Sequence, residues 1–261
     1  MKPSKLISLL TDFGLQDGYV GAMHGVIHSI CPDIRIIDLT HGVPPQNVEA
    51  ASFLLRAHSR YFPRGTIFVA VVDPGVGTRR DILLATDERC FYIAPDNGLL
   101  SFLQNRPGVR FYAAHNPKYW LPSVSQTFHG RDIFAPLAAH LANGVPIQTL
   151  FQPKEHIQPL EQPEAEDLGD AIQGRIIYQD RFGNLVTNIA RERLGEREPA
   201  YVQFGEDLQL PLVNNYAAVP SNAPLAIWGS FDYLEIAVNH GNAAQTFASR
   251  LQLPVILKLK P

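Results

Sequence analysis

Residues 66–80 read TIFVAVVDPGVGTRR, a continuous apolar run that ends in an aspartate and a loop with two glycines. An apolar run of this length without alternation is typical of a strand buried on both faces. Similar runs occur at residues 6–10, 34–39, 82–85, 91–94 and 109–113, and amphipathic stretches separate them at 18–30, 47–61, 98–104 and 132–142. This alternation of strands and helices predicts an α/β fold, with a largely parallel sheet flanked by helices.

The second half of the chain has a different pattern. Residues 146–171 are rich in proline and acidic residues, which is typical of a linker or a wrapping segment. Beyond them, short strands and turns predict a smaller, mainly antiparallel, β-barrel-like domain. We therefore expect an N-terminal α/β domain at residues 1–150, a linker at 151–172 and a C-terminal domain at 173–261.

The composition excludes several classes of protein. The chain has 261 residues, of which 46% are apolar and 18% charged, so it can bury a substantial core. A net charge of −3 provides no basic footprint for nucleic acid. No apolar run approaches the ~18 residues of a membrane span, and the first residues do not resemble a signal peptide. We expect a soluble, cytoplasmic protein with no nucleic-acid or membrane partner.

Four aspartates stand where predicted strands end: Asp12, Asp38, Asp73 and Asp96. In an open parallel sheet, ligands bind outside the carboxyl ends of the strands. Acids gathered at that edge suit a ligand that carries hydroxyl groups or positive charge. For any single aspartate, the simpler interpretation is a turn residue or a helix N-cap.

Two segments of the N-terminal half carry further candidate chemistry. The loop at 73–80 has glycines that let the backbone approach a ligand, but it matches neither a phosphate loop nor a dinucleotide fingerprint. A hairpin turn is the alternative. His129 precedes a predicted helix, and a structural role is its alternative. His24 and His28 have a spacing that suits a metal, but no third ligand is evident, so no metal site is predicted.

The C-terminal half has two candidate binding features. Residues 180–184, DRFGN, follow an apolar strand; Phe182 could stack on a ligand and Asn184 could bind a polar edge, or the segment is only a hairpin turn. Downstream, Tyr233, Glu235 and Asn239 share one face of a predicted strand. The Glu and the Asn could hold a base or an amino acid, or this face is simply solvated.

Six segments taken together are more informative than each alone. They are Thr11–Gly14, Asp73–Thr78 with Arg80, Asp96–Gly98, Phe128–Arg131, Phe182–Asn188 and Tyr233–Asn239. In this order they resemble the S-adenosyl-L-methionine (SAM) hydroxide adenosyltransferases, relatives of the bacterial fluorinase and chlorinase. The resemblance implies an α/β domain followed by a β-barrel domain, and a homotrimer whose sites are shared between subunits. It also implies hydrolysis of SAM to adenosine and L-methionine, with SAM as the substrate and no cofactor.

The resemblance also implies the catalytic residues. Asp73, Arg80 and His129 correspond to the Asp–Arg–His set of the hydroxide branch, whereas the halogenases look to carry Tyr at the positions of Asp73 and His129. The choice of Arg80 over Arg79 rests on its spacing from Asp73. The alternatives to a hydrolase are a SAM-dependent halogenase and a non-catalytic protein that binds adenosine or SAM.

The remaining correspondences concern the substrate. Asp12 corresponds to the acid that holds the ribose hydroxyls, and Asp17 to a position near methionine and ribose. The C-terminal correspondences are Asp180, Phe182 and Asn184 for a clamp on the amino-acid group, Tyr216 for a ring that stacks on adenine, Ser230 for a contact to the methionine carboxylate, and the backbone near Val238 and Asn239 for the adenine edge. The chain departs from the halogenases at Phe231 and Val238, where they have Arg, and at Gln46, where they have Trp.

Overall fold

A computed structural model describes residues 2–160 and 164–260 of the chain. Its contacts divide the chain into two compact units, Met1–Glu161 (unit 1) and Gln162–Pro261 (unit 2). Each unit has a hydrophobic core of its own, and we describe each by itself.

Unit 1 contains a seven-stranded sheet in the order β2-β1-β3-β5-β4-β6-β7. Its strands are β1 (Leu6–Thr11), β2 (Arg35–Thr40), β3 (Ile67–Val71), β4 (Ile82–Thr86), β5 (Phe91–Pro95), β6 (Arg110–Ala114) and β7 (Phe151–Lys154). Strands β2, β1, β3 and β5 are parallel to one another, whereas β4, β6 and β7 pair antiparallel. The predicted α/β class is therefore confirmed, and the sheet is mixed.

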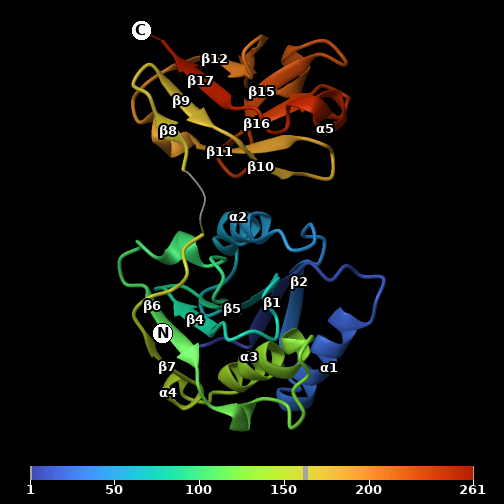
Figure 1. Ribbon diagram of the computed structural model, residues 1–261, viewed down its shortest axis with the longest axis vertical. Helices are drawn as coiled ribbons and strands as arrows, with labels where there is room; N and C mark the ends of the chain where they lie inside the picture. The colour runs from blue at the N-terminus through green and yellow to red at the C-terminus, as the bar shows by residue number, and fades with distance from the viewer. Residues whose placement is uncertain (1, 161–163, 261) are drawn as a thin grey trace. The chain divides into compact units, whose positions relative to one another are not determined.

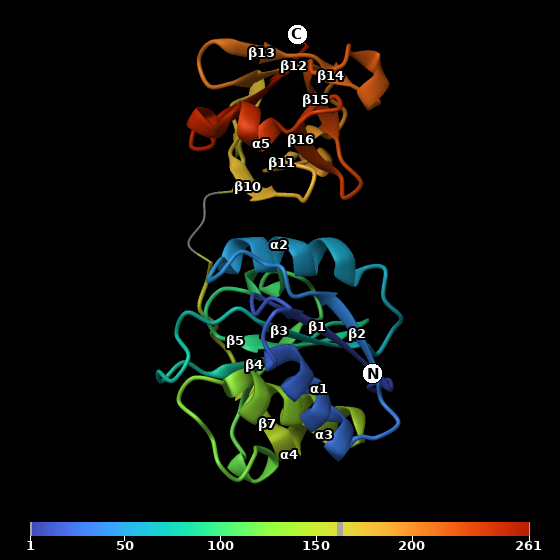
Figure 2. The same cartoon turned by 90° about the vertical axis from the view of Figure 1, so that its right-hand side faces the viewer.

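Helices cover both faces of this sheet (Figures 1 and 2): α2 (Val48–Ser59) lies on one face, and α1 (Tyr19–Ile30) and α3 (Ala135–Ala142) on the other. Asn47 caps α2, its side chain accepting the Ala50 amide hydrogen at 2.9 Å. Shorter helical segments are η1 (Ser101–Leu103), η2 (Pro117–Tyr119), the π-helix η3 (Gly130–Phe134) and α4 (Ile147–Leu150). Between the sheet and the face covered by α1 and α3, buried aliphatic residues of β1, β3, α1 and α3 form a hydrophobic core.

The proline-rich segment 146–171 has more regular structure than we expected. Strand β7 forms the edge of the unit 1 sheet, where Pro153 is tolerated because an edge strand can spare a donor. Beyond β7 the segment runs along unit 1, since the Gln158 amide donates to Asp96 at 2.7 Å and the Leu160 amide to Ser101 Oγ at 2.6 Å. The segment mixes polar residues with prolines, so its sequence has no strand pattern that would have predicted β7.

Unit 2 consists of two five-stranded sheets, with orders β10-β11-β16-β15-β14 and β13-β12-β17-β9-β8. All pairs are antiparallel except β14 with β15. The strands are β8 (Glu166–Asp167), β9 (Ala171–Gly174), β10 (Ile176–Gln179), β11 (Leu185–Ala190), β12 (Pro199–Phe204), β13 (Leu208–Leu210), β14 (Leu212–Val213), β15 (Pro224–Trp228), β16 (Tyr233–Val238) and β17 (Val255–Leu259).

Four short helical segments complete unit 2: η4 (Arg191–Leu194), η5 (Tyr216–Ala218), α5 (Ala243–Thr246) and η6 (Ala248–Arg250). The two sheets enclose a core that includes Ile172, Val202, Leu234 and Ile236. Because side chains alternate along a strand, the neighbours Tyr233, Glu235 and Ala237 of β16 lie on the opposite face of their sheet.

Candidate functional site

Two predicted site residues of unit 1 lie at neighbouring strand ends. Strands β1 and β3 are adjacent and parallel, with Thr11 opposite Val71, so Asp12 and Asp73 follow the same edge of the sheet. Asn97, which follows β5, donates to the Val72 carbonyl at 2.9 Å and fixes the chain just before Asp73. The carboxyl edge therefore positions both carboxylates, as expected for a site in an open parallel sheet.

Asp73, Arg80 and His129 form one hydrogen-bonded group. Arg80 Nε donates to both carboxylate oxygens of Asp73 at 2.8 Å, and Arg80 Nη2 also contacts Oδ2. Arg80 Nη2 lies 3.1 Å from His129 Nδ1. The side chains of Asp73 and Arg80 are only 5% and 9% exposed, so the ion pair is shielded from solvent. Arg79, in contrast, is exposed.

The backbone holds this group in place from two sides. Gly77 adopts φ +79°, and a Cβ there would lie 2.5 Å from the Gln126 carbonyl oxygen, so only glycine lets the two loops approach so closely. His129 is followed directly by the π-helix η3, a rare element that often marks functional sites. Asp132 stabilises this start, because its Oδ2 accepts the Ser125 amide at 2.8 Å and the Ser125 hydroxyl at 2.7 Å.

The protonation state of His129 follows from its partner. A guanidinium can only donate, so the contact with Arg80 requires a lone pair on Nδ1 and leaves the hydrogen on Nε2. Burial and the charge of Arg80 lower the pKa of His129, while Asp73 and Asp132 oppose this shift. His129 is therefore neutral at pH 7.

Asp12 is held by a loop that crosses from β2. The Gln46 amide donates to Asp12 Oδ2 at 2.8 Å, and Gln46 itself has φ +63°. Next to Asp12, the ring of Phe13 packs against Phe128 at 5.7 Å and Tyr19 at 5.9 Å between centroids. Aromatic rings thus lie between the Asp12 loop and the segment that carries His129.

Three other acids of the N-terminal half have different surroundings. Asp17 is exposed. Asp38 accepts a hydrogen bond from His24 at 2.9 Å; burial acts to raise its pKa, but hydrogen bonds from His24 and His41 outweigh burial and lower it. Asp96 is buried and binds the Gln158 amide and, at 3.4 Å, Lys154. Asp38 and Asp96 thus serve structural contacts.

In unit 2, the segment 180–184 is both a hairpin turn and a polar cluster. Asp180 Oδ1 accepts the amides of Phe182 and Asn184 at 2.9 and 2.8 Å, and Asn184 Nδ2 donates to Asp180 Oδ2 at 2.9 Å. Gly183 completes the turn with φ +85°. The ring of Phe182 is 77% exposed, so it is free to meet a ligand or another chain.

Glu235 and Tyr216 belong to the same neighbourhood. Glu235 lies between β11 and β15, opposite Val186 and Ile227, and only 9% of it is exposed. Burial and then the charge of Asp180 raise the pKa of Glu235 to about 7. Burial, Glu235 and Asp180 also raise the pKa of Tyr216, whose hydroxyl contacts Asn184. These side chains form one polar group on the outer face of the sheet.

The last three predicted residues lie at the ends of β16. Ser230 is exposed in the turn before the strand. The Val238 side chain packs in the core of unit 2, and its carbonyl accepts the Gly241 amide at 3.0 Å. Asn239 is buried; its side chain donates to the Val219 carbonyl at 2.8 Å, and its amide donates to the Ala223 carbonyl at 3.0 Å. Asn239 thus orders the loop that precedes β15.

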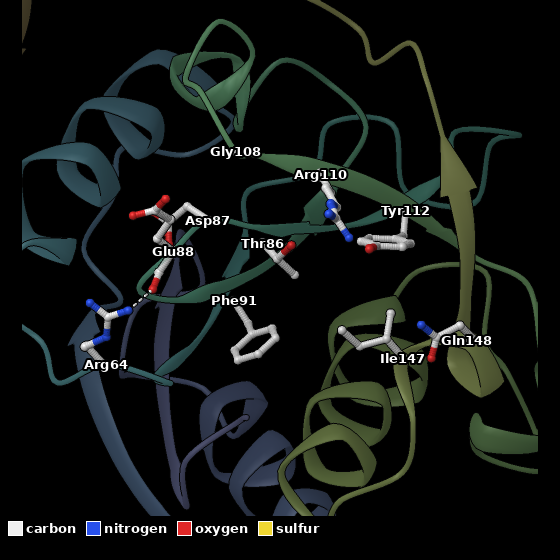
Figure 3. Close-up of a pocket in the computed structure, with 10 residues that line it drawn as sticks. All are labelled: Arg64, Thr86, Asp87, Glu88, Phe91, Gly108, Arg110, Tyr112, Ile147 and Gln148. Atoms are coloured by element: carbon white, nitrogen blue, oxygen red, sulfur yellow. Dashed lines mark hydrogen bonds between the residues drawn. The ribbon is translucent and has the colours of Figure 1, made fainter. Parts of the chain in front are cut away.

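A separate cavity of about 530 Å³ lies in unit 1 near the start of β5, away from the carboxyl ends of the parallel strands (Figure 3). Phe91 begins β5, whereas Asp73 lies near the end at which parallel strands finish. Arg64 in its wall donates to the Glu88 carbonyl at 2.6 Å. The lining is Arg64, Thr86, Asp87, Glu88, Phe91, Gly108, Arg110, Tyr112, Ile147 and Gln148, which includes none of the predicted site residues.

The described residues provide neither a metal-binding cluster nor a membrane-spanning helix. Within residues 2–160 and 164–260, no group of three or more His, Cys, Asp or Glu side chains could hold a metal ion. His24, half of the pair with metal-compatible spacing, instead binds Asp38. Among the helices that the structure describes, none is long and apolar enough to cross a membrane.

Comparison with known families gives two matches that together span most of the chain. Residues 7–151 match the SAM hydroxide adenosyltransferase N-terminal domain, and residues 174–256 match the C-terminal domain of the same family. This chain belongs to the SAM hydroxide adenosyltransferase family. The resemblance inferred from six short segments is therefore confirmed.

Relatives within and near the family differ in their names. A protein of Thermus thermophilus named (R)-S-adenosyl-L-methionine hydrolase is 38% identical, covering 96% of this chain and 98% of its own length. One of the same name from Salinispora tropica is also 38% identical, covering 94% of both chains. A fluorinase of Nocardia brasiliensis is 29% identical and covers 97% of both. A solved structure from Thermotoga maritima is similar with a TM-score of 0.88 and 33% identity, over 97% of this chain and 99% of that one.

Some contacts at the site had no signal in the sequence. The Gln46 amide on Asp12 is a backbone contact, which no side-chain pattern reveals. The bond between Thr11 and His41, at 2.8 Å, joins residues that are 30 positions apart. Ser125 supports the π-helix through its hydrogen bond to Asp132. The only sign of this contact in the sequence is the position of Asp132, just after the segment that carries His129.

Proposed function

We propose that this chain hydrolyses SAM to adenosine and L-methionine, with Asp73, Arg80 and His129 as the catalytic residues. Membership of the family and the names of its relatives support the reaction. The observation that carries the assignment of residues is the hydrogen-bonded group in which Arg80 contacts both Asp73 and His129. No cofactor is needed, because SAM is an activated substrate.

The substrate explains why so few groups suffice. SAM is a sulfonium, so methionine departs from C5′ as a neutral thioether and needs no general acid. Water attacks C5′ from the side opposite sulfur, the C5′–S bond breaks, and its electron pair stays on sulfur. The tasks left to the protein are to align the water with that bond and to remove its proton.

Asp73 is the group suited to take that proton. Arg80 stays protonated, and the lone pair of His129 Nδ1 already faces Arg80 while Nε2 carries hydrogen. Asp73 forms an ion pair with Arg80, and each of its oxygens has lone pairs beyond those that face the guanidinium. Such general-base help contributes typically ~10²–10⁴-fold to the rate. Arg80 and His129 then orient the water by their own hydrogen bonds.

Residues predicted from the sequence and from the resemblance bind the rest of SAM in this proposal. Asp12 holds the ribose hydroxyls and Asp17 lies near the methionine end. In unit 2, Tyr216 stacks on adenine, while the remaining residues contact the amino-acid group or the adenine edge: Asp180, Phe182, Asn184, Ser230, Glu235, Val238 and Asn239. The raised pKa of Glu235 supports a role near a cationic group, because a carboxyl that is costly to ionise gains from such a partner.

The test is to incubate the purified chain with each sulfonium epimer of SAM in ¹⁸O-water. The relatives are named for the (R) epimer, so we expect faster turnover of (R)-SAM, with one solvent oxygen at C5′ of the adenosine formed. Adenosine without the label, or no turnover of either epimer, would refute the proposal. The second outcome together with tight adenosine binding would favour a non-catalytic binding protein.

Halogenation is a weaker candidate for electrostatic reasons. A carboxylate ~4 Å from a halide costs roughly 4 kcal/mol at an effective dielectric of ~20, and the guanidinium of Arg80 offsets part of this cost. We therefore expect adenosine alone from the wild type at high chloride. Substantial 5′-chloro-5′-deoxyadenosine in chromatography would favour the halogenase assignment.

We propose further that the active form is a cytoplasmic homotrimer whose sites are shared between subunits. The resemblance supports the assembly, and the predicted substrate residues belong to two compact units. Light scattering that gives a monomer with full activity would refute the trimer. Fractionation of the native cells that finds the protein outside the cytoplasm would refute the location.

A further inference from the structure

One network of unit 1 is not used by the proposed chemistry, yet it adjoins the site. It joins the end of β1 and the loop after it, Thr11–Gly14, to the loop that follows β2, His41–Gln46. His41 is 4% exposed, so it is buried although it can carry charge. A buried histidine needs partners, and those partners lead directly to Asp12.

The two loops are linked at four points. His41 Nδ1 lies 2.8 Å from Thr11 Oγ1, and the His41 carbonyl accepts the Gly14 amide at 2.9 Å. The Val43 amide contacts the Thr11 carbonyl at 3.4 Å, and the Gln46 amide donates to Asp12 Oδ2 at 2.8 Å. Thr11 Oγ1 also accepts the Phe13 amide at 3.2 Å. The residues on both sides of Asp12 are therefore tied to His41.

The far side of His41 faces Asp38. Its Nε2 lies 3.1 Å from Asp38 Oδ1, the same oxygen that His24 contacts at 2.9 Å, but the His41 contact lacks hydrogen-bond geometry. Because Asp38 belongs to β2, the ring of His41 connects the central sheet to the Asp12 loop. Gln46 adopts φ +63°, a conformation that a residue with a side chain keeps only where its surroundings enforce it. The bond from the Gln46 amide to Asp12 is the link that holds Gln46 itself.

We propose that His41 is a positioning residue for Asp12: it locks the two loops together, so that the Gln46 amide occupies Oδ2 and Oδ1 stays available to the ribose hydroxyls. This inference rests on the proposed function, since it takes Asp12 as the group that binds the ribose. Among the described residues, Oδ1 of Asp12 accepts no hydrogen bond. A carboxylate with one oxygen fixed has a single orientation for a diol and loses little freedom on binding.

The test compares two ligands that differ only in the hydroxyls. Titration calorimetry gives the affinity of adenosine and of 2′,3′-dideoxyadenosine for the wild type and for His41→Phe. We expect the wild type to prefer adenosine by ~10- to 100-fold, the typical value of hydrogen bonds to a charged group. In His41→Phe this preference should fall to less than about a third of the wild-type value, while dideoxyadenosine binds within ~2-fold of its wild-type affinity.

Two further variants keep the test decisive. His24→Gln is the matched control, because His24 contacts the same Asp38 oxygen but no residue of the Asp12 loop, and it should keep the full preference. Thr11→Val removes the hydroxyl that joins His41 to Phe13, and it should reduce the preference as His41→Phe does; it decides the matter if His41→Phe does not fold.

The outcomes separate this inference from the proposed function. An undiminished preference in the folded variants, or an equal loss of affinity for both ligands, would overturn the role of His41 while leaving the hydrolase intact. A wild type that hydrolyses SAM without any preference for the ribose hydroxyls would overturn the role of Asp12, and that of His41 with it. A wild type without turnover or adenosine binding would overturn the proposed function itself.

Discussion

Replacing Glu235 with Gln should remove a pH-dependent cost from unit 2. Glu235 lies in the middle strand of its sheet, and a Cβ built on Gly229 would lie 1.7 Å from its Oε1, so the carboxyl fills the space above that glycine. Burial and the charge of Asp180 raise its pKa from 4.5 to about 7. Gln has nearly the same shape and stays neutral at every pH.

The sign and size of the effect follow from linkage. A carboxyl whose pKa is higher in the folded state binds its proton more tightly there. Its stabilising contribution is therefore complete below pH 4.5 and is lost as the pH rises through about 7. A difference of about 2.5 pKa units, from 4.5 to about 7, corresponds to roughly 3 kcal/mol at about 1.4 kcal/mol per unit. Of this, ~2.5 kcal/mol is lost between pH 5 and pH 8.

The assay is urea unfolding at pH 5 and pH 8, followed by fluorescence. Trp120 lies in unit 1 and Trp228 in unit 2, so a Trp120→Phe background reports on unit 2 alone. Between pH 5 and pH 8, the free energy of unfolding of Glu235→Gln should rise by ~2–3 kcal/mol relative to that of the wild type. Glu206→Gln, at an exposed glutamate of the same unit, should gain nothing. If the free energy of unfolding changed equally with pH in the wild type and in Glu235→Gln, the reasoning would be refuted.

Three further predictions concern the catalytic group. Asp73→Asn should lower kcat by ~10² or more while adenosine still binds, because the base is lost and the shape is kept; a wild-type kcat would remove Asp73 from the mechanism. Arg80→Lys should lower kcat at least ~10-fold, since lysine keeps the charge but not the fork that spans Asp73 and His129, and Arg79→Lys should change little. Because burial and Arg80 lower the pKa of His129 below 6.5, the acid-side decline of kcat/KM should have its midpoint below pH 6.5, as a proton enters Nδ1; a midpoint above pH 6.5 would contradict this assignment.

Much of the fold could be predicted because burial leaves a direct trace in the sequence. Strands β1 and β3 are continuous apolar runs, and both were placed within two residues of their ends. The direction of β4 was less obvious, since a strand buried on both faces has the same composition either way. Only four residues join Thr86 to Phe91, which is too short for the crossover that a parallel pair requires. The length of this connection was therefore the feature of the sequence that could have predicted the antiparallel pairing of β4 with β5.

The site was predictable where a side chain acts and not where the backbone acts. The edge that holds Asp12 and Asp73 follows from strand ends, and the Arg80 that pairs with Asp73 has the spacing the resemblance implied. Asp38 and Asp96 have the same position in the pattern, yet they bind histidines and a returning segment. The pattern locates an acid at an edge, but tertiary contacts decide which acids stay available. The Gln46 amide on Asp12 belongs to those contacts.

The charges of the catalytic group fit the proposed reaction better than any one residue does. Asp73 and Arg80 cancel each other in a contact that is almost closed to solvent, and His129 is neutral. The group therefore adds no net charge beside a cationic sulfonium, so it does not repel the substrate. In the proposed reaction, water loses its proton to Asp73 and attacks, so negative charge on oxygen meets positive charge on sulfur, and the transition state is less polar than the separated ions. A site that excludes bulk water favours such a charge merger, and the Asp73–Arg80 pair, with side chains only 5% and 9% exposed, is shielded in this way.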